Sequence, residues 1–165
     1  MSSTPDNLKN RHLPDKTKVV CGLLKRGTTF LLARRAQGQA LAGWWEFPGG
    51  KLEPDETPAE ALEREIFEEL GWDVTAELFV GTAEFVWKDR PFLMEAWIVP
   101  APPAGEPEAR VHDAFVWLEP QDLLDPLGPY LAKTSPADLS ILQDYLKLTT
   151  DKSHAFSKEK KHAEN

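Results

Sequence analysis

Cysteine is almost absent from this chain, because Cys21 is the one cysteine among its 165 residues. A single cysteine excludes an intrachain disulfide framework and a cysteine-ligated zinc site. The chain also lacks any apolar run that is long enough to span a membrane, and no apolar signal region lies near Met1. These absences predict a soluble, cytoplasmic protein that has no membrane partner.

Basic residues are also fewer than acidic residues in this chain. Its formal net charge is −8 and its isoelectric point is about 5.0. The field of such a protein does not attract bare polyanions, so we expect no stable complex with long nucleic acid. An anionic substrate would have to arrive with cations of its own.

Lysine is missing from most of the central stretch. Between Trp44 and Trp72 no lysine follows Lys51, and the only other cation is Arg64. The same stretch places three glutamates at helical spacing: Glu65, Glu68 and Glu69. Like charges one helical turn apart cost roughly 0.2–0.5 kcal/mol per pair. A solvated acidic face explains the pattern, but a divalent cation would make it favourable, and carboxylate oxygens select Mg²⁺ or Mn²⁺ over zinc or copper.

The chain divides into one domain and two polar ends. Residues 1–17 are predicted to be a flexible N-terminal arm, and residues 149–165 a flexible basic tail. Residues 18–148 carry the apolar patterning of a single domain that is large enough to bury a core.

Local patterns predict the order of elements in this domain. Two apolar runs around residues 25–28 indicate a β-hairpin, in which Gly27 can adopt a positive φ. A helix is expected from Thr57, which begins a Thr-x-x-Glu capping box, to Gly71. Further strands are expected at residues 72–89, 92–100 and 114–118. With a second helix after Ser135, this order predicts an α/β (α+β) fold, a mixed β-sheet sandwiched between helices.

Two glycines follow Pro48, and they predict a tight turn in which the backbone can approach a ligand closely. A carbonyl of this Gly49–Gly50 turn could complete the oxygen shell of a cation held by the helix. Glu95 is a separate case, since a lone charge in a strand faces either solvent or a cleft.

The spacing of the glycines and charges adds a family resemblance. Gly50 is followed after five residues by Glu56, after seven more by Arg64-Glu65-Ile66, and then by Glu68-Glu69 and Gly71-Trp72. This pattern resembles the Nudix box throughout, with Trp72 at a position where the family more often has an aliphatic residue. The resemblance implies the Nudix fold.

The resemblance also implies an activity. Nudix enzymes hydrolyse phosphoric anhydrides, cleaving a nucleoside diphosphate linked to another group with the help of divalent metals. The implied metal ligands are Glu65, Glu68 and Glu69, one of which would also orient or deprotonate the attacking water. Gly49 would supply a backbone carbonyl to the metal, and Arg64 would hold a box carboxylate in place. Glu56 would stabilise the loop.

Segments outside the box are similar to the MutT-like branch of the family, which cleaves nucleoside triphosphates to monophosphate and pyrophosphate. The similarity lies in LLARRA and in WEFPGGKLEPDET. It implies a nucleotide pocket lined by Arg35, Glu46, Phe47, Pro48 and Gly49. Arginine offers planar, multidentate donors to a substrate, whereas Phe47 can pack on a base or belong to the core.

Asp138 falls where MutT-like enzymes place the side chain that reads the base. The enzymes that act on oxidised guanine carry asparagine there, whereas an ionised aspartate only accepts hydrogen bonds. Asp138 would therefore favour a base edge that presents N–H donors, as cytosine and guanine do. A capping box with Ser135 explains the same residue, and the two roles are compatible.

One position departs from the MutT-like pattern. The branch often has a further metal-binding glutamate six residues before the tryptophan of the penultimate strand, and here that residue is Val111. The nearest polar candidates are His112, Asp113 and Glu95, although His112 is better explained as a loop histidine. The number of metals and the identity of the general base stay open.

We therefore expect a Mg²⁺-dependent (or Mn²⁺-dependent) nucleoside triphosphate pyrophosphohydrolase that acts on oxidised dGTP or (d)CTP-type nucleotides. Two other hydrolase activities stay open: removal of pyrophosphate from 5′-triphosphorylated RNA, and cleavage of nucleotide sugars or dinucleotides. A Nudix-like binding domain without catalysis is a further alternative, which the complete set of box glutamates disfavours. The sequence does not indicate the oligomeric state.

Overall fold

The computed structural model describes the backbone of residues 15–163 and the side chains of residues 15–151. Its strands are β1 (Thr17–Arg26), β2 (Thr29–Arg35), β3 (Trp45–Glu46), β4 (Gly49–Lys51), β5 (Leu78–Trp87), β6 (Arg90–Pro100) and β7 (His112–Leu118). Its helices are α1 (Pro58–Leu70), α2 (Pro120–Leu123), the 3₁₀ turn η1 (Leu131–Lys133) and α3 (Pro136–Ala163). Most of the predicted N-terminal arm, residues 1–14, lies outside the described residues.

One mixed sheet organises the strands. Its order is β3-β2-β1-β6-β5, with β4 paired to β1 and β7 paired to β2. β1 and β6 run parallel from the Thr17–Phe92 pair to the Lys25–Pro100 pair, and the other strand pairs are antiparallel. A parallel pair needs a crossover connection, and α1 lies within the one that joins β1 to β6.

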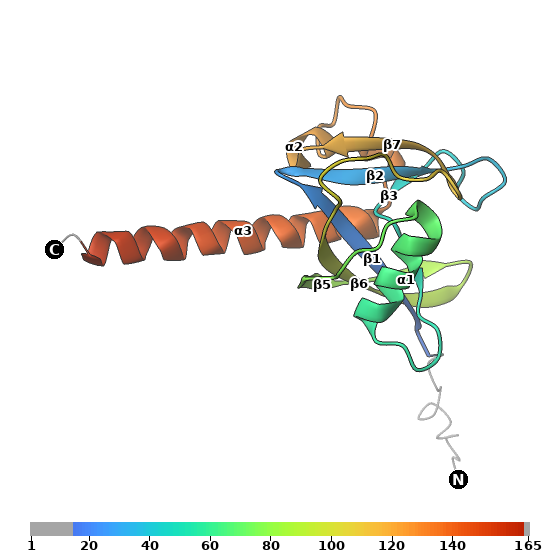
Figure 1. Cartoon of the computed structure of the whole chain (residues 1–165), viewed down its shortest axis with the longest axis horizontal. Coiled ribbons are helices and arrows are strands. Elements are labelled where there is room, and N and C mark those ends of the chain that lie inside the picture. The colour runs from blue at the N-terminus through green and yellow to red at the C-terminus, as the bar shows by residue number, and fades with distance from the viewer. Residues whose placement is uncertain (1–14, 164–165) are drawn as a thin grey trace, which may run out of the picture.

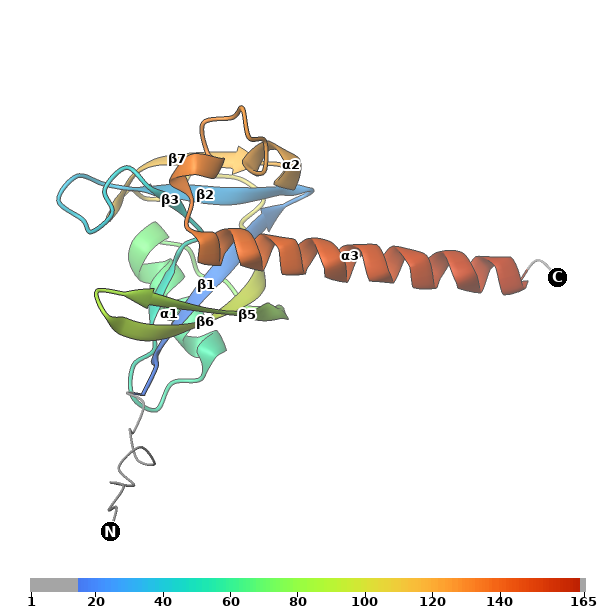
Figure 2. The same cartoon turned by 180° about the vertical axis from the view of Figure 1, so that it is seen from behind.

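Helix α1 covers one face of the sheet and α3 covers the other (Figure 1 and Figure 2). Side chains alternate between these faces along β1. Leu23 packs in the cluster that contains Ile141 and Leu142 of α3, whereas Leu24 packs in the cluster that contains Leu62 of α1. The predicted α+β fold, with a mixed sheet between helices, is confirmed.

Helix α1 begins and ends where its own sequence predicts. The hydroxyl of Thr57 accepts a hydrogen bond from the N–H of Glu60, whose side chain accepts one from the N–H of Thr57. These two bonds complete the predicted capping box. Gly71 ends the helix in the left-handed conformation, with φ 71°, and Leu62 and Ile66 are fully buried against the sheet.

The segment after Pro48 differs from the prediction. Gly49 and Gly50 form a strand rather than a turn, because they pair with Cys21 and Val20 of β1. The expected close approach of the backbone is present. A Cβ atom on Gly49 would lie 1.9 Å from the carbonyl oxygen of Val20, and one on Gly50 would lie 2.3 Å from the carboxyl carbon of Glu65.

Helix α3 is longer than expected. It continues to Ala163, so a helix occupies most of the segment that was predicted to be a flexible tail from residue 149. Lysine, glutamate and alanine in that segment are good helix formers, and a helix already nucleated by packing extends at low cost. Its far half projects beyond the sheet in Figure 1. No helix in the described part of the chain is long and apolar enough to cross a membrane.

Candidate active site

A cavity of about 860 Å³ lies between β1, the β3–β4 segment, α1, the β5–β6 hairpin and the start of α3. Its lining includes most of the residues that the sequence singles out: Arg35, Glu46, Phe47, Gly49, Glu65, Glu69 and Asp138. Pro48, Arg64 and Glu68 are not part of the lining. The fold therefore brings together residues as far apart in sequence as Arg35 and Asp138.

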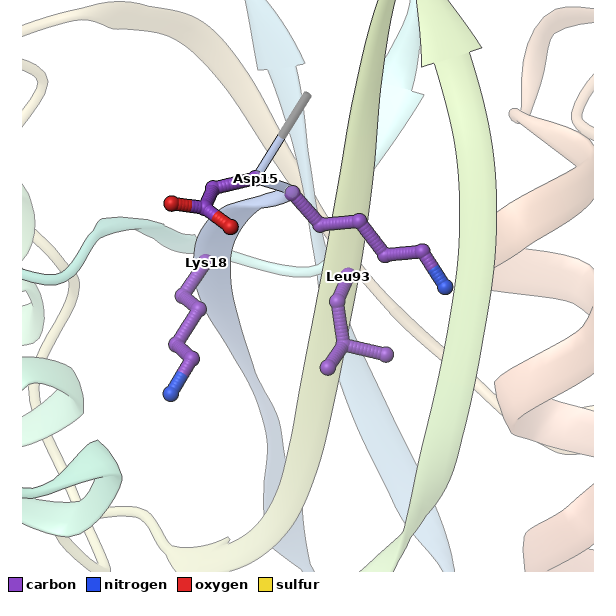
Figure 3. Close-up of a pocket in the computed structure, with 4 residues that line it drawn as sticks. Asp15, Lys18 and Leu93 are labelled. Carbon is purple, nitrogen blue, oxygen red and sulfur yellow. The ribbon is translucent and has the colours of Figure 1, made fainter. Parts of the chain in front are cut away.

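A second cavity, of about 640 Å³, lies at the first residues of β1 (Figure 3). It is lined by Asp15, Lys16, Lys18 and Leu93. None of the predicted site residues contributes to it, and it presents no converging acidic groups. The larger cavity is therefore the candidate active site.

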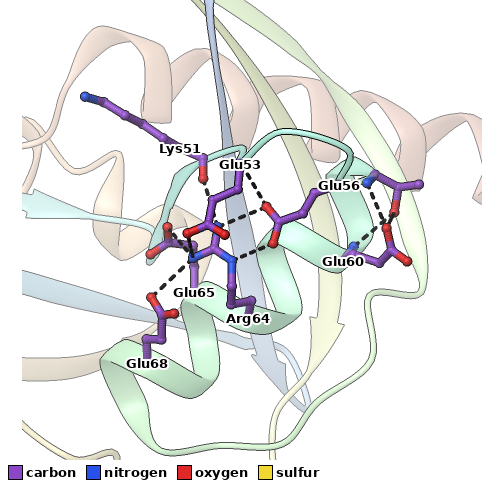
Figure 4. Close-up of polar contacts among 8 residues, drawn as sticks. Lys51, Glu53, Glu56, Glu60, Arg64, Glu65 and Glu68 are labelled. Atoms are coloured by element: carbon purple, nitrogen blue, oxygen red, sulfur yellow. Dashed lines mark hydrogen bonds and ion pairs between the residues drawn. The ribbon is translucent and has the colours of Figure 1, made fainter.

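Arg64 is the centre of a network on the solvent side of α1 (Figure 4). Its Nε donates to Oε1 of Glu56 at 2.6 Å, and its Nη2 donates to Oε2 of the same carboxylate at 3.1 Å. Nη2 also donates to the carbonyl oxygen of Lys51 at 3.0 Å. Hydrogen bonding to Arg64 is the main cause that lowers the pKa of Glu56. Arg64 thus ties α1 to the loop that precedes it.

The same guanidinium reaches two of the box glutamates. Nη1 of Arg64 donates to Oε1 of Glu65 at 3.1 Å and to Oε2 of Glu68 at 3.2 Å. Glu65 is largely buried beneath β4, and this burial raises its pKa although Arg64 opposes the shift. Glu68 has 55% of its side chain exposed and faces outward toward Arg64.

Glu69 lines the cavity and is more buried than Glu65. One carboxylate oxygen accepts a hydrogen bond from the backbone of Gly49. The other, Oε2, is buried and has no hydrogen-bond partner among the described residues. Burial, followed by the negative charges of Glu46 and Glu65, raises the pKa of Glu69 to about 8. A buried carboxylate oxygen without a donor is costly, so this atom marks a place where a cation would be favourable.

The donor set fits a divalent metal ion of the hard class. Glu69 offers the unpartnered oxygen, Glu65 lies against Gly50 where a Cβ atom would collide with it, and every available donor is an oxygen. No group of three or more acidic, histidine or cysteine side chains in residues 15–151 converges into a ready metal cluster. The carboxylate of Glu68 is paired with Arg64.

Arg35 and Glu46 form an ion pair on the cavity wall. Nη1 of Arg35 lies 3.0 Å from both carboxylate oxygens of Glu46, and its Nε donates to the carbonyl oxygen of Ala40. The neighbouring Arg34 faces away from the cavity, because its Nε donates to Oδ1 of Asp113 at 2.7 Å.

Phe47 and Asp138 meet at another part of the cavity wall. Phe47 belongs to the core and also lines the cavity. Its N–H donates to Oδ1 of Asp138 at 3.2 Å. Asp138 contacts the hydroxyl of Ser135 and is only 5% exposed. Burial is the main cause that raises its pKa to about 7. The hydroxyl of Ser135 in turn accepts a hydrogen bond from the N–H of Asp138 at 3.1 Å, so Ser135 caps α3. The carboxyl of Asp138 supports this cap through the Ser135 hydroxyl and also lines the cavity.

None of the three substitutes for the glutamate that Val111 replaces lines the cavity. Asp113 pairs with Arg34, and Glu95 lies on β6 beside Val20, on the sheet face that α1 covers. The expectation that His112 is a loop histidine was wrong. It begins β7 and is buried, because its ring packs on Phe115 and its Nε2 lies 2.9 Å from Oε1 of Glu46.

Aromatic residues form much of the remaining cavity wall: Trp44, Trp45, Phe85, Trp87 and Phe92. Sequence reasoning did not assign them to the site. The adjacent pair Trp44-Trp45, beside a glycine-containing loop, is the signal that could have indicated it, since large aromatics next to a loop are often found at binding sites.

The fold and the box together define a hydrolase class, and comparison with known proteins agrees. Residues 15–138 match the NUDIX domain family. The chain belongs to this family of hydrolases, whose members generally use divalent metal cations.

The chain is also similar to individual proteins of this family. The chain is 37% identical over 132 residues to the CTP pyrophosphohydrolase of Escherichia coli, covering 79% of this chain and 92% of that protein. It is 41% identical over 109 residues to the putative 8-oxo-dGTP diphosphatase 2 of Mycobacterium tuberculosis, covering 65% of this chain and 76% of that protein. The solution structure of the E. coli ORF135 protein superposes with a TM-score of 0.69 at 36% identity, covering 81% of this chain and 91% of that one.

Proposed function

We propose that the chain is a Mg²⁺-dependent nucleoside triphosphate pyrophosphohydrolase, which converts NTP and water to NMP and pyrophosphate. One observation carries the proposal. The unpartnered Oε2 of Glu69 and the carboxylate of Glu65 line the same cavity as Arg35 and Asp138. A cation site and two groups that can bind a nucleotide thus share one enclosure.

The position of each residue suggests its role in binding the cation or the nucleotide. Glu65, Glu69 and the carbonyl of Gly49 would hold the cation, joined by Glu68. A bound Mg²⁺, or Mn²⁺ in its place, would neutralise the phosphates and stabilise the charge that develops on phosphorus oxygens. Arg64 keeps the box helix and its loop in register. Arg35, already anchored by Glu46, would present its guanidinium to the nucleotide.

The base would lie at the end of the cavity formed by Phe47, Asp138 and the aromatic residues. Burial raises the pKa of Asp138 to about 7, and the protonated form of a carboxyl can donate as well as accept a hydrogen bond. Oxidised dGTP and (d)CTP-type nucleotides are the leading substrates. The names of the E. coli and M. tuberculosis relatives support the same two classes. A cytoplasmic location, where free nucleotides are available, fits this activity.

The test is a panel of natural and oxidised nucleoside triphosphates, nucleotide sugars and 5′-triphosphorylated RNA, each assayed with the full chain and Mg²⁺ or Mn²⁺. We expect turnover of free triphosphates with release of pyrophosphate rather than phosphate. Hydrolysis in isotopically heavy water should label the monophosphate if water attacks the α-phosphorus. Faster cleavage of RNA ends or nucleotide sugars would overturn the substrate assignment, and no turnover of any compound would favour a binding domain.

A further inference from the structure

His112 is a buried polar side chain beside the proposed nucleotide pocket, and it has no role in the function above. It is 3% exposed and does not line the cavity. Its Nε2 lies 2.9 Å from Oε1 of Glu46, a residue that does line the cavity. A polar ring buried behind a pocket residue requires an explanation, because burying it costs free energy unless it is hydrogen-bonded.

The strand geometry directs His112 toward Glu46. Arg34 pairs with Ala114 across β2 and β7, but the next residue, Arg35, pairs with His112, so the register shifts by one residue. Asp113 is the extra residue of this irregularity, and it pairs with Arg34. Irregularities of this kind re-aim side chains next to active sites. Here the shift sets His112 and Arg35 opposite each other, with Glu46 bonded to both.

Glu46 is held from two directions as a result. Nη1 of Arg35 contacts both of its oxygens at 3.0 Å, and His112 contacts Oε1. A carboxylate only accepts, so Nε2 of His112 carries the proton of this bond. Nδ1 is buried and has no partner in the described part of the chain, which makes Glu46 the one hydrogen-bonding contact of the ring found there.

We propose that His112 is a positioning residue for the nucleotide pocket. It fixes the carboxylate of Glu46, which in turn fixes the guanidinium of Arg35 in the orientation that meets the nucleotide. This inference rests on the proposed function. It assigns His112 an effect on substrate binding through Glu46, not a contact with the substrate or the cation.

The experiment compares the full-length chain with His112→Phe, which keeps a planar ring against Phe115 but has no donor, and with His112→Gln, whose amide restores an N–H. We expect His112→Phe to raise KM for the best nucleotide roughly tenfold, as for loss of one hydrogen bond to a charged group, with a smaller change in kcat. His112→Gln should recover part of the loss. Asp113→Asn, on the same strand irregularity, is the matched control and should leave KM unchanged.

A double-mutant cycle tests whether the effect passes through Glu46. In a Glu46→Ala background, His112→Phe should cause no further rise in KM. An equal rise in both backgrounds would overturn the proposal, as would a KM that is unchanged in His112→Phe.

Nitrogen NMR of the imidazole separates this proposal from the proposed function, because it needs no substrate. The ring should carry its proton on Nε2 in the wild type, and the chemical-shift signature of a hydrogen bond from that N–H should be lost in Glu46→Ala. If no nucleotide is hydrolysed, the proposed function fails, and the dissociation constant of a non-hydrolysable triphosphate then replaces KM in the same cycle. Absence of the Nε2 proton in the wild type would overturn the positioning role even if nucleotides are hydrolysed.

Discussion

Arg64 donates two hydrogen bonds to the carboxylate of Glu56, from Nε at 2.6 Å and from Nη2 at 3.1 Å. The pair joins the middle of α1 to the loop that follows β4, across eight positions of sequence. Because Nη1 of the same guanidinium holds Glu65 and Glu68, the loop, the helix and two carboxylates of the proposed cation site share one anchor.

Replacing Arg64 with lysine keeps the charge but removes the planar fork, so Glu56 and the box glutamates can no longer be held together. We expect Arg64→Lys to lower metal affinity and kcat by roughly 10- to 100-fold, as for other groups that orient metal ligands. Isothermal titration with Mn²⁺ and steady-state kinetics measure the two effects. Arg90→Lys, at an exposed arginine of β6, is the control. Equal activity of the two variants would contradict the anchoring role.

The two glycines of β4 provide a matched pair of substitutions. A methyl group on Gly49 would meet the backbone of β1. The three atoms nearest to a methyl group on Gly50 all belong to the end of the Glu65 side chain, which can rotate away. We expect Gly49→Ala to destabilise the fold by about 1–3 kcal/mol or more, as overpacking does. Gly50→Ala should keep most of the stability but lose metal affinity, because Glu65 is displaced. Urea denaturation measures the stability of the two variants, and metal titration measures their metal affinity. A stable Gly49→Ala variant together with a destabilised Gly50→Ala variant would contradict the predicted contacts.

Helix α1 and strand β4 differ in how far they can be predicted from the sequence. Helix α1 could be predicted because Thr57, Glu60 and Gly71 satisfy its ends locally. The strand at Gly49 could not, because its partner, β1, lies about thirty residues earlier and only the folded chain brings them together. The contact of His112 with Glu46 depends on a register shift between β2 and β7, which leaves no mark on residue spacing.

Trp72 is a further case in which packing explains an unusual residue. The guanidinium of Arg26 lies 5.4 Å from the ring centroid of Trp72 and 4.5 Å from that of Trp117. It also donates to the carbonyl oxygens of Pro102 and Gly105. An aromatic residue at the end of the box thus contributes cation–π contacts that an aliphatic one could not make. The spacing identified the box, but this reason for the tryptophan required the fold.

Glu69→Gln should impair cation binding without destabilising the fold. The substitution preserves the shape of the side chain but replaces the ionised carboxylate that would bind the cation, so metal affinity and kcat should fall by more than about 100-fold, the upper end for groups outside the metal shell. The thermal midpoint in the absence of metal should not fall, because the cavity gains no void. Glu63→Gln is the control on the same helix, since Glu63 only accepts a bond from the N–H of Ala76. Retained activity in Glu69→Gln would remove Glu69 from the shell.

Asp138→Asn should change how stability depends on pH. The folded protein raises the pKa of Asp138 from 3.8 to about 7, so this carboxyl favours the folded state fully below its unfolded pKa. That contribution is lost as pH rises through about 7, with a limiting slope of about 1.4 kcal/mol per pH unit. Asparagine has no such titration and can still accept from the N–H of Phe47. The free energy of unfolding, measured in urea from pH 5 to pH 8, should therefore fall more steeply in the wild type than in the variant.

The same variant distinguishes the two roles of Asp138 once the best substrate is known. If the side chain reads the base, Asp138→Asn should shift the preference between oxidised dGTP and (d)CTP-type nucleotides while hydrolysis continues. If it only caps α3, the preference should stay constant and only the pH dependence of stability should change. Parallel pH slopes of wild type and variant would contradict the raised pKa itself, because the amide of the variant cannot titrate and the difference between the slopes is the contribution of that one carboxyl.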